Sequence, residues 1–126
     1  MLITRQLLPS DEKELRYLHA QYYYPEFSYP DFRKFVATFA VCDENDHIVS
    51  AGGIRPIAES IIITDKFRPR SERVRALHEI LGISIAVCKQ QNIDQLHAFI
   101  EGKTWEKALK TVGFNDCNGR ALVLQV

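Results

Sequence analysis

Four arginines gather around one predicted helix start in the middle of the chain. The apolar, β-branched run Ser60 to Asp65 predicts a buried strand, Pro69 predicts a break, and Ser71 opens a long amphipathic pattern. The amides in the first turn of a helix lack intrahelical partners, and the helix dipole adds to their attraction for anions. The arginines are Arg68, Arg70, Arg73 and Arg75. This arrangement predicts a binding site for a phosphate-bearing ligand.

The same arginines have a second interpretation as a solvated basic loop and helix face. Arg73 and Arg75 fall in the first turn of the predicted helix, where positive charge opposes the dipole. This placement indicates a compensating negative partner. The candidates are the phosphates of a ligand, the carboxylates of Glu72 and Glu79, or another macromolecule.

Candidates for acid–base chemistry are few. Asp65 ends the first predicted strand and Glu101 follows a later one, Gln95 to Ile100, so both carboxylates could face a cleft where the strands diverge. A solvated carboxylate at a strand end is the commoner role. His97 lies inside the later strand and could act as a base, although most such histidines are hydrogen-bonded or on the surface. Glu101 is the best candidate for a base, and no histidine spacing predicts a metal site.

Charge and cysteine content limit the class of protein. The 126 residues include 16 basic and 16 acidic side chains, which disfavours a nucleic-acid partner and makes an RNA-binding arginine loop the weakest interpretation. Cys42, Cys88 and Cys117 are widely spaced, which suits neither a disulfide framework nor a metal site. We expect packing or incidental roles for Cys88, on the helical stripe, and for Cys117, near a predicted turn, because no histidine or basic neighbour in the sequence would activate the Cys117 thiol. No secretory leader or membrane-length apolar run occurs, so we expect a cytoplasmic protein with no membrane partner.

The elements that must position these residues follow from periodicity and turn signals. Before the arginines we expect a strand within Met1 to Leu8, a helix that Pro9 to Glu12 caps and that stops before Pro25, and a short helix capped by Asp31. The tyrosine-rich connection between these helices could line an acceptor pocket or anchor the short helix. A hairpin follows, from Phe39 to Val41 and from Ile48 to Ile54, in which Gly52 and Gly53 mark a bulge or a close backbone approach.

After the loop, the pattern predicts a long helix and a strand–helix–strand ending. The long helix runs from Ser71 to about Gln90 on the stripe Val74, Leu77, Leu81, Ile85 and Cys88. The ending comprises the strand Gln95 to Ile100, a helix from Thr104 to Val112 with Gly113 as its C-terminal cap, a turn at Asn118-Gly119, and a strand from Ala121 to Val126. No linker divides the chain, so we expect one domain over residues 1–126.

This order of elements resembles the GNAT acetyltransferase superfamily over nearly the whole chain. In that family a loop written R/Q-x-x-G-x-G/A holds the coenzyme A pyrophosphate at the start of the long helix. The matching stretch keeps the first position and has arginine at both glycine positions; it is Arg70-Ser71-Glu72-Arg73-Val74-Arg75. The resemblance implies that these residues bind acetyl-CoA, and that the backbone of Ile63, Thr64 and Asp65 pairs with its pantetheine arm. Arginine can also grip phosphate through its own side chain.

A second stretch, Trp105 to Phe114, is similar to the family's late helix ending in Gly-Phe. Many members carry a tyrosine there as general acid, and the corresponding residue here is Leu109, which cannot donate a proton. The resemblance implies an N-acetyltransferase that moves an acetyl group from acetyl-CoA to an amine of a small molecule or peptide by direct attack. The alternative is a catalytically inactive member that acts as a regulatory or structural binding partner.

The predicted fold class is α/β, a GNAT-like acyl-CoA N-acyltransferase fold in which helices flank a mixed, mostly antiparallel sheet. Its last strand, Ala121 to Val126, could pair with a second subunit as a homodimer or be covered by its own hairpin. The acceptor amine does not follow from any motif, because loop shape sets it in this fold.

Overall fold

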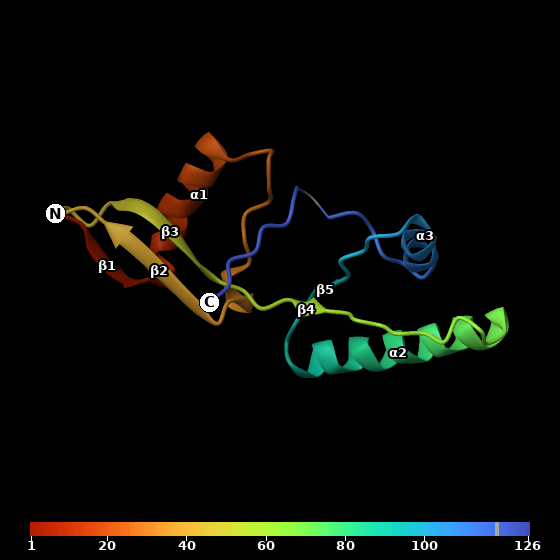
Figure 1. Ribbon diagram of the computed structural model, residues 1–126. Helices are drawn as coiled ribbons and strands as arrows, with labels where there is room; N and C mark the ends of the chain where they lie inside the picture. The colour runs from red at the N-terminus through yellow and green to blue at the C-terminus, as the bar shows by residue number, and fades with distance from the viewer. Residues whose placement is uncertain (118) are drawn as a thin grey trace. The chain divides into compact units, whose positions relative to one another are not determined.

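The computed structural model describes residues 1–117 and 119–126 and has an α/β fold (Figure 1). These residues form two compact units. The first unit comprises Met1–Ala58 with Cys88–Gln95, and the second comprises Glu59–Val87 with Leu96–Val126. Each unit has its own hydrophobic core. Whether the two units act as the single predicted domain stays a prediction.

The first unit is built on a three-stranded antiparallel sheet. Its strands, in spatial order, are β1 (Ile3–Gln6), β2 (Ala37–Cys42) and β3 (Ile48–Ile54). The turn between β2 and β3 is closed by Asp43, whose carboxylate accepts hydrogen bonds from the amides of Asn45 and His47, both at 2.9 Å. The predicted hairpin and the predicted first strand are confirmed.

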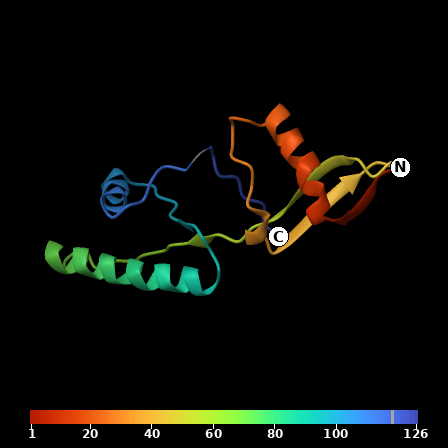
Figure 2. The same ribbon diagram turned by 180° about the vertical axis from the view of Figure 1, so that it is seen from behind.

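Helix α1 (Glu12–Tyr22) lies on one face of this sheet, as Figures 1 and 2 show. Leu15 and Leu18 pack from α1 against the buried core of the first unit, which consists of Ala40, Cys42 and Ile48. The helix ends before Pro25, as predicted. The short 3-10 turn η1 (Pro9–Asp11) precedes it, and Asp11 stands at the N-cap position of α1, within the predicted capping segment Pro9 to Glu12, although its side chain bonds to none of the first amides of the helix. Glu12 and Glu14 form the predicted acidic first turn.

The second predicted helix is a 3-10 turn, η2 (Phe32–Lys34). Asp31 caps it as predicted, because its carboxylate accepts the Arg33 amide hydrogen bond at 3.1 Å. Aromatic rings support the segment, with Tyr29 and Phe32 edge to face at 5.8 Å and Phe32 and Phe35 at 5.0 Å. These ring contacts lie within the segment itself, so the predicted anchoring of the short helix onto the sheet stays a prediction.

The two adjacent glycines of β3 have different surroundings. A Cβ atom on Gly53 would collide with the carbonyl oxygen of Ala37 on β2, whereas one on Gly52 would meet nothing within 4 Å. Of the two predicted roles, close backbone approach is correct, and it applies to Gly53. The irregularity in the ladder lies elsewhere in β3, where Val49 is the extra residue between the pairs Val41–Ser50 and Cys42–Ile48.

The second unit packs two helices together. Helix α2 (Arg70–Gln90) contributes Leu77 and Leu81 to its core, and α3 (Lys103–Thr111) contributes Leu109. Both helices match their predicted ranges. Gly113 caps α3 in the left-handed region, with φ of 109°, as its position predicted. None of the helices in the described residues is both long enough and apolar enough to span a membrane.

A short strand pair flanks α2 in the sequence. Strand β4 (Ala58–Glu59) pairs with β5 (Leu96–His97). The Ala58 amide donates to the Gln95 carbonyl at 3.2 Å, and the Ser60 amide donates to the His97 carbonyl at 2.7 Å. From the first of these bonds to the second, the residue number rises by two on both strands, so the two strands run parallel. The strand–helix–strand order β4, α2, β5 therefore forms a parallel crossover, and its two strands make a sheet separate from β1-β2-β3.

Three predicted strands differ from the structure. Residues 60–65 form no strand, and the pairing segment lies just before them. The predicted strand Gln95 to Ile100 is reduced to Leu96–His97, and residues 121–126 form no strand and are exposed. The predicted turn at Asn118-Gly119 falls in part on residue 118, which lies outside the described residues. β-propensity measures fit to neighbouring strands, so an apolar run without a partner does not become a strand.

Candidate functional site

The first turn of α2 carries the predicted anion site. Pro69 precedes the helix, and its carbonyl accepts the Arg73 amide at 3.1 Å, so the helical ladder begins there. The amides of Arg70, Ser71 and Glu72 precede this ladder, and among the described residues no side chain caps them. These three amides are free to bind an anion, and the positive end of the helix dipole favours one.

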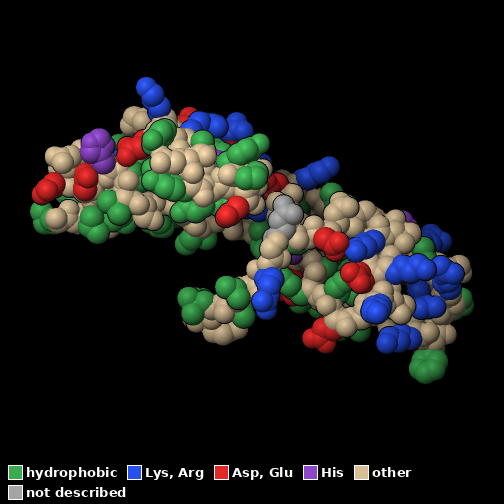
Figure 3. Space-filling model, turned by 90° about the horizontal axis from the view of Figure 1, so that it is seen from above, with side chains coloured by type: hydrophobic (Ala, Val, Ile, Leu, Met, Phe, Trp, Pro, Cys, Tyr) green, Lys and Arg blue, Asp and Glu red, His purple; other side chains and the backbone are tan. Residues whose placement is uncertain are grey.

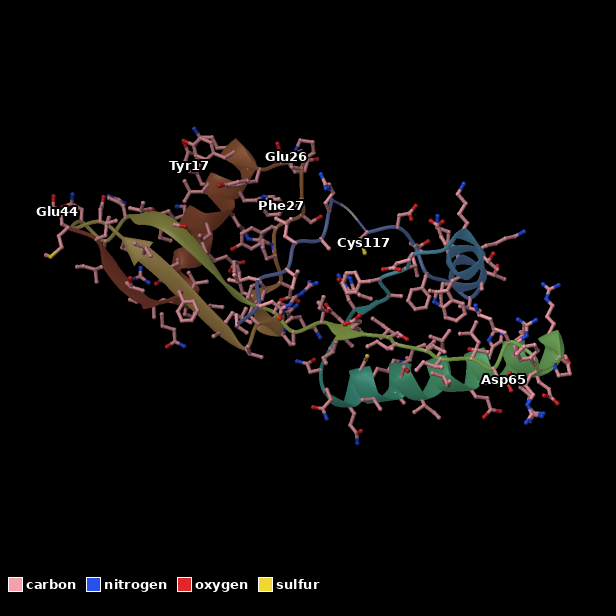
Figure 4. The ribbon with its side chains drawn as sticks, viewed as in Figure 1. Tyr17, Glu26, Phe27, Glu44, Asp65 and Cys117 are labelled. Carbon is pink, nitrogen blue, oxygen red and sulfur yellow. The ribbon has the colours of Figure 1, made fainter. Side chains whose placement is uncertain are left out.

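The turn before α2 is tied together by its own groups. The Asp65 side chain accepts the Phe67 amide at 3.0 Å, and its carboxylate lies 3.8 Å from the Arg68 guanidinium. Arg73 reaches back and donates through Nε to the Arg68 carbonyl at 3.1 Å. The loop is therefore held in place by local bonds even though its side chains are exposed. Figure 4 shows Asp65 at the N-terminal end of α2.

The four arginines have different partners. Arg75 approaches Glu79 at 3.5 Å, so a carboxylate compensates it as one sequence interpretation predicted. Glu72 approaches Arg68 at 3.9 Å instead of Arg73, for which the same interpretation predicted a carboxylate partner. Arg70 makes no ion pair within the part of the chain that the structure describes. Figure 3 shows Lys and Arg side chains gathered at the end of the second unit where α2 begins. Arg70 is thus the guanidinium most available to a ligand.

The segments predicted to flank the site diverge after β4 and β5. The last bond between them joins Ser60 to His97, and the chain then continues through Ile63, Thr64 and Asp65 on one side and to Glu101 on the other. Ile63 is 95% exposed, and Asp65 and Glu101 are also exposed. The predicted cleft between Asp65 and Glu101 stays a prediction. The predicted cofactor residues follow one another along the loop and the first turn of α2, and Glu101 has no bonded partner in the described residues.

Leu109 stands where the family resemblance places a proton-donating tyrosine. Its side chain is 3% exposed and packs in the core of the second unit against Leu77 and Leu81. This residue is therefore a packing residue and provides no general acid.

A pair of residues that sequence reasoning did not connect lies near β5. The thiol sulfur of Cys117 is 3.7 Å from Nδ1 of His97, within hydrogen-bonding distance for sulfur. Twenty positions separate the two residues. No local pattern signals such a contact, so only the fold could find it. Elsewhere in the described residues, no group of three or more His, Cys, Asp or Glu side chains is placed to hold a metal ion.

The first unit contains a hollow of about 710 Å³ beside α1. Its wall includes Leu15, Arg16 and Tyr29, and the Arg16 guanidinium lies 4.2 Å from the centre of the Tyr29 ring. The Tyr29 hydroxyl is buried and has no hydrogen-bond partner in the described residues. Burial raises the pKa of this hydroxyl, which therefore stays protonated at neutral pH.

Replacement of Tyr29 by Phe is expected to raise the free energy of unfolding by about 1 kcal/mol, because it removes a buried hydroxyl that lacks a partner. Urea unfolding of both proteins measures the change. Tyr17→Phe is the matched control, since the Tyr17 residue on α1 is 65% exposed and should show no change (Figure 4). A loss of stability in Tyr29→Phe would mean that the hydroxyl does have a partner.

A second, smaller hollow of about 450 Å³ lies in the other unit between α2 and the end of α3. His78 and Ile85 of α2 and Phe114 line it. The hollow contains none of the predicted cofactor residues, so it and the predicted anion site are different features.

Comparison of the chain with protein-family models and with curated proteins finds no match.

Proposed function

We propose that this chain is a small N-acetyltransferase of the GNAT type, which binds acetyl-CoA at the start of α2 and transfers the acetyl group to an amine. The observation that carries the proposal is the arginine-rich first turn of α2, which follows β4 after the loop of residues 60–69 in a parallel β4–α2–β5 crossover. The antiparallel order β1-β2-β3 with α1 on one face agrees with the same family.

The donor set at this turn fits a pyrophosphate. Three backbone amides, those of Arg70, Ser71 and Glu72, lie ahead of the helical ladder, and the Arg70 guanidinium supplies a mobile cation beside them. Arg73 and Val74 continue the turn, and Arg75 is engaged with Glu79. Arg73 and Arg75 occupy the family's two glycine positions. Their side chains need not fill the phosphate site, because Arg73 bonds to the Arg68 carbonyl and Arg75 pairs with Glu79.

Acetyl-CoA would supply an activated acetyl group, and the chain's own residues would orient it and handle one proton. The backbone of Ile63 and Thr64 has hydrogen-bonding groups that an extended ligand arm could pair with, and the Asp65 amide could extend that pairing, whereas the Asp65 carbonyl already accepts the Arg68 amide at 3.3 Å. Glu101, on the opposite diverging segment, would accept the proton of the attacking ammonium. Leu109 is buried, so the leaving thiolate takes its proton from solvent.

The proposal predicts that acetyl-CoA and free CoA bind with micromolar affinity and that Arg70→Ala weakens both about tenfold, since one charge-assisted contact to phosphate is lost. Isothermal titration measures the affinities. Lys89→Ala is the matched control, because it removes one exposed positive charge from the other end of the same helix. Equal weakening by both variants would point to general charge attraction. The absence of heat at millimolar ligand would refute the proposal.

A second candidate is a GNAT-fold protein that binds a partner without catalysis. Its support is the burial of Leu109, together with the exposed position of Glu101, which has no second acid or base bonded to it in the described residues. If acetyl-CoA binds but no amine in a broad screen is acetylated, this candidate replaces the enzyme.

A further inference from the structure

Cys117 differs from the other two cysteines in its access to solvent. Cys42 and Cys88 are buried in the cores of their segments, whereas Cys117 is exposed in the chain that follows α3 (Figure 4). Burial also raises the pKa of the Cys42 thiol, which keeps it protonated and unreactive. Only Cys117 presents its sulfur to both solvent and a histidine ring.

Both sides of the Cys117–His97 contact are anchored. The His97 carbonyl accepts the Ser60 amide at 2.7 Å in the β4–β5 pair, and the Phe99 ring stacks against the imidazole with ring centres 6.4 Å apart. On the other side, Asp116 pairs with Lys110 at 3.3 Å. The contact is therefore positioned by bonds in the backbone and side chains next to each partner.

Cys117 is also held by the end of α3. The Phe114 amide donates to the Leu109 carbonyl at 3.1 Å, and the Phe114 ring packs against the core of the second unit. Only two residues separate Phe114 from Cys117. This short spacing limits how far the thiol can move from the imidazole.

We propose that Cys117, with His97 as its proton acceptor, is a site of thiol–disulfide exchange with low-molecular-weight disulfides. The thiol proton moves from Sγ to Nδ1 of the neutral imidazole, which requires the tautomer with hydrogen on Nε2. The thiolate then attacks one sulfur of the disulfide, the S–S bond of the reagent breaks, and a mixed disulfide forms on Cys117. The second half of the reagent leaves as a thiolate and takes the proton, so no other oxidant is needed.

The surroundings favour disulfide exchange over acyl transfer at this thiol. Acyl transfer passes through a tetrahedral oxyanion, which needs hydrogen-bond donors aimed at it. Thiol–disulfide exchange needs a thiolate and an open path to the sulfur, and Cys117 has both a proton acceptor and exposure. A histidine within hydrogen-bonding reach of a nucleophile is the arrangement that activates cysteine elsewhere.

The test follows the reaction of the native chain with dipyridyl disulfide, whose released thiopyridone absorbs light. One equivalent should be released quickly, and Cys117→Ser should abolish that phase. His97→Gln should slow the phase about fivefold near neutral pH, since the proton acceptor is lost. His78→Gln is the matched control, because His78 is exposed on α2 in the same unit and should leave the rate unchanged.

Two results would overturn the proposal. The first is a fast phase that survives in Cys117→Ser, and the second is a wild-type rate in His97→Gln while Cys88 remains protected. If His97→Gln exposes Cys88, the comparison moves to the unmodified protein and a synthetic peptide of residues 114–120. The folded chain should then react about fivefold faster than the peptide, and an equal rate would reject the activation of Cys117 by His97.

Discussion

Gly53→Ala is expected to destabilise the first unit by about 4 kcal/mol, the largest effect of a single methyl group in this chain. The added Cβ would collide with the Ala37 carbonyl oxygen and lie 2.9 Å from Cδ2 of Phe35 and 3.1 Å from the Thr38 Cα. Two of these three atoms belong to the backbone of β2, which cannot move away without breaking the β2–β3 ladder. The cost arises from lack of space rather than from backbone conformation.

The neighbouring glycine supplies the control. Gly52→Ala adds the same methyl group one residue earlier in β3, where nothing lies within 4 Å, so its effect should stay within about 0.5 kcal/mol. Urea unfolding followed by circular dichroism compares the two variants with the parent. If Gly52→Ala and Gly53→Ala lose the same stability, the register of β2 and β3 is not the one described.

This glycine pair also illustrates the limit of the sequence analysis. The sequence indicates that a glycine in this strand permits a bulge or a close approach, but both glycines have the same local signals. The pairing of Thr38 with Gly53 and of Phe39 with Gly52 decides which one touches the facing backbone. That register depends on the whole hairpin and on its irregularity at Val41 and Cys42.

Local signals predicted the helices well. The start of α2, the end of α1 before Pro25 and the cap at Gly113 all lie within one or two residues of their predicted positions. The same signals predicted the arginine cluster at the start of α2, because all of its members lie within one short stretch. Capping and helical periodicity depend on neighbours a few residues away, which a sequence displays directly.

Strands and the Cys117–His97 pair required contacts between distant segments. Residues 60–65 have the composition of a strand, yet only Ala58–Glu59 pairs with β5. The contact of Cys117 with His97 depends on where the chain after α3 returns to β5. Neither outcome follows from local pattern, since each is decided by which partner a segment meets.

The second large effect concerns Asp11, a buried carboxylate whose partner the sequence did not reveal. Asp11 is 7% exposed and accepts two hydrogen bonds from the Arg5 guanidinium, both at 2.8 Å, and one from the Leu8 amide at 2.7 Å. Asp11→Asn leaves the guanidinium without its nearest opposite charge and removes one of the acceptors. We expect a loss of about 2 kcal/mol, at the low end for a buried pair, because Arg5 is partly exposed and keeps Asp46 as a second partner.

This loss should depend on pH in a defined direction. Hydrogen bonds from Arg5 lower the pKa of Asp11 below its ordinary value. The carboxylate therefore contributes its full stabilisation at every pH at which Asp11 would be ionised in the unfolded chain as well. The stabilisation is complete above about pH 4, the ordinary range of an aspartate, and disappears as the pH falls through the lower folded value. The difference between the parent and Asp11→Asn should therefore be largest near neutral pH and shrink below about pH 4.

Asp46→Asn is the matched control for Asp11→Asn. Asp46 makes the other ion pair of Arg5, at 3.1 Å, but its side chain is 74% exposed, and asparagine tolerates its φ of 63°. Water replaces the lost contact there, so the control should change stability by less than about 0.5 kcal/mol and show little pH dependence. Urea unfolding from pH 3 to 7 measures all three proteins. Each substitution removes one carboxylate charge that is paired with the Arg5 guanidinium. A larger loss of stability in Asp11→Asn would therefore be due to the burial of Asp11. Equal losses in the two variants would show that charge alone accounts for the contribution of the Arg5–Asp11 pair.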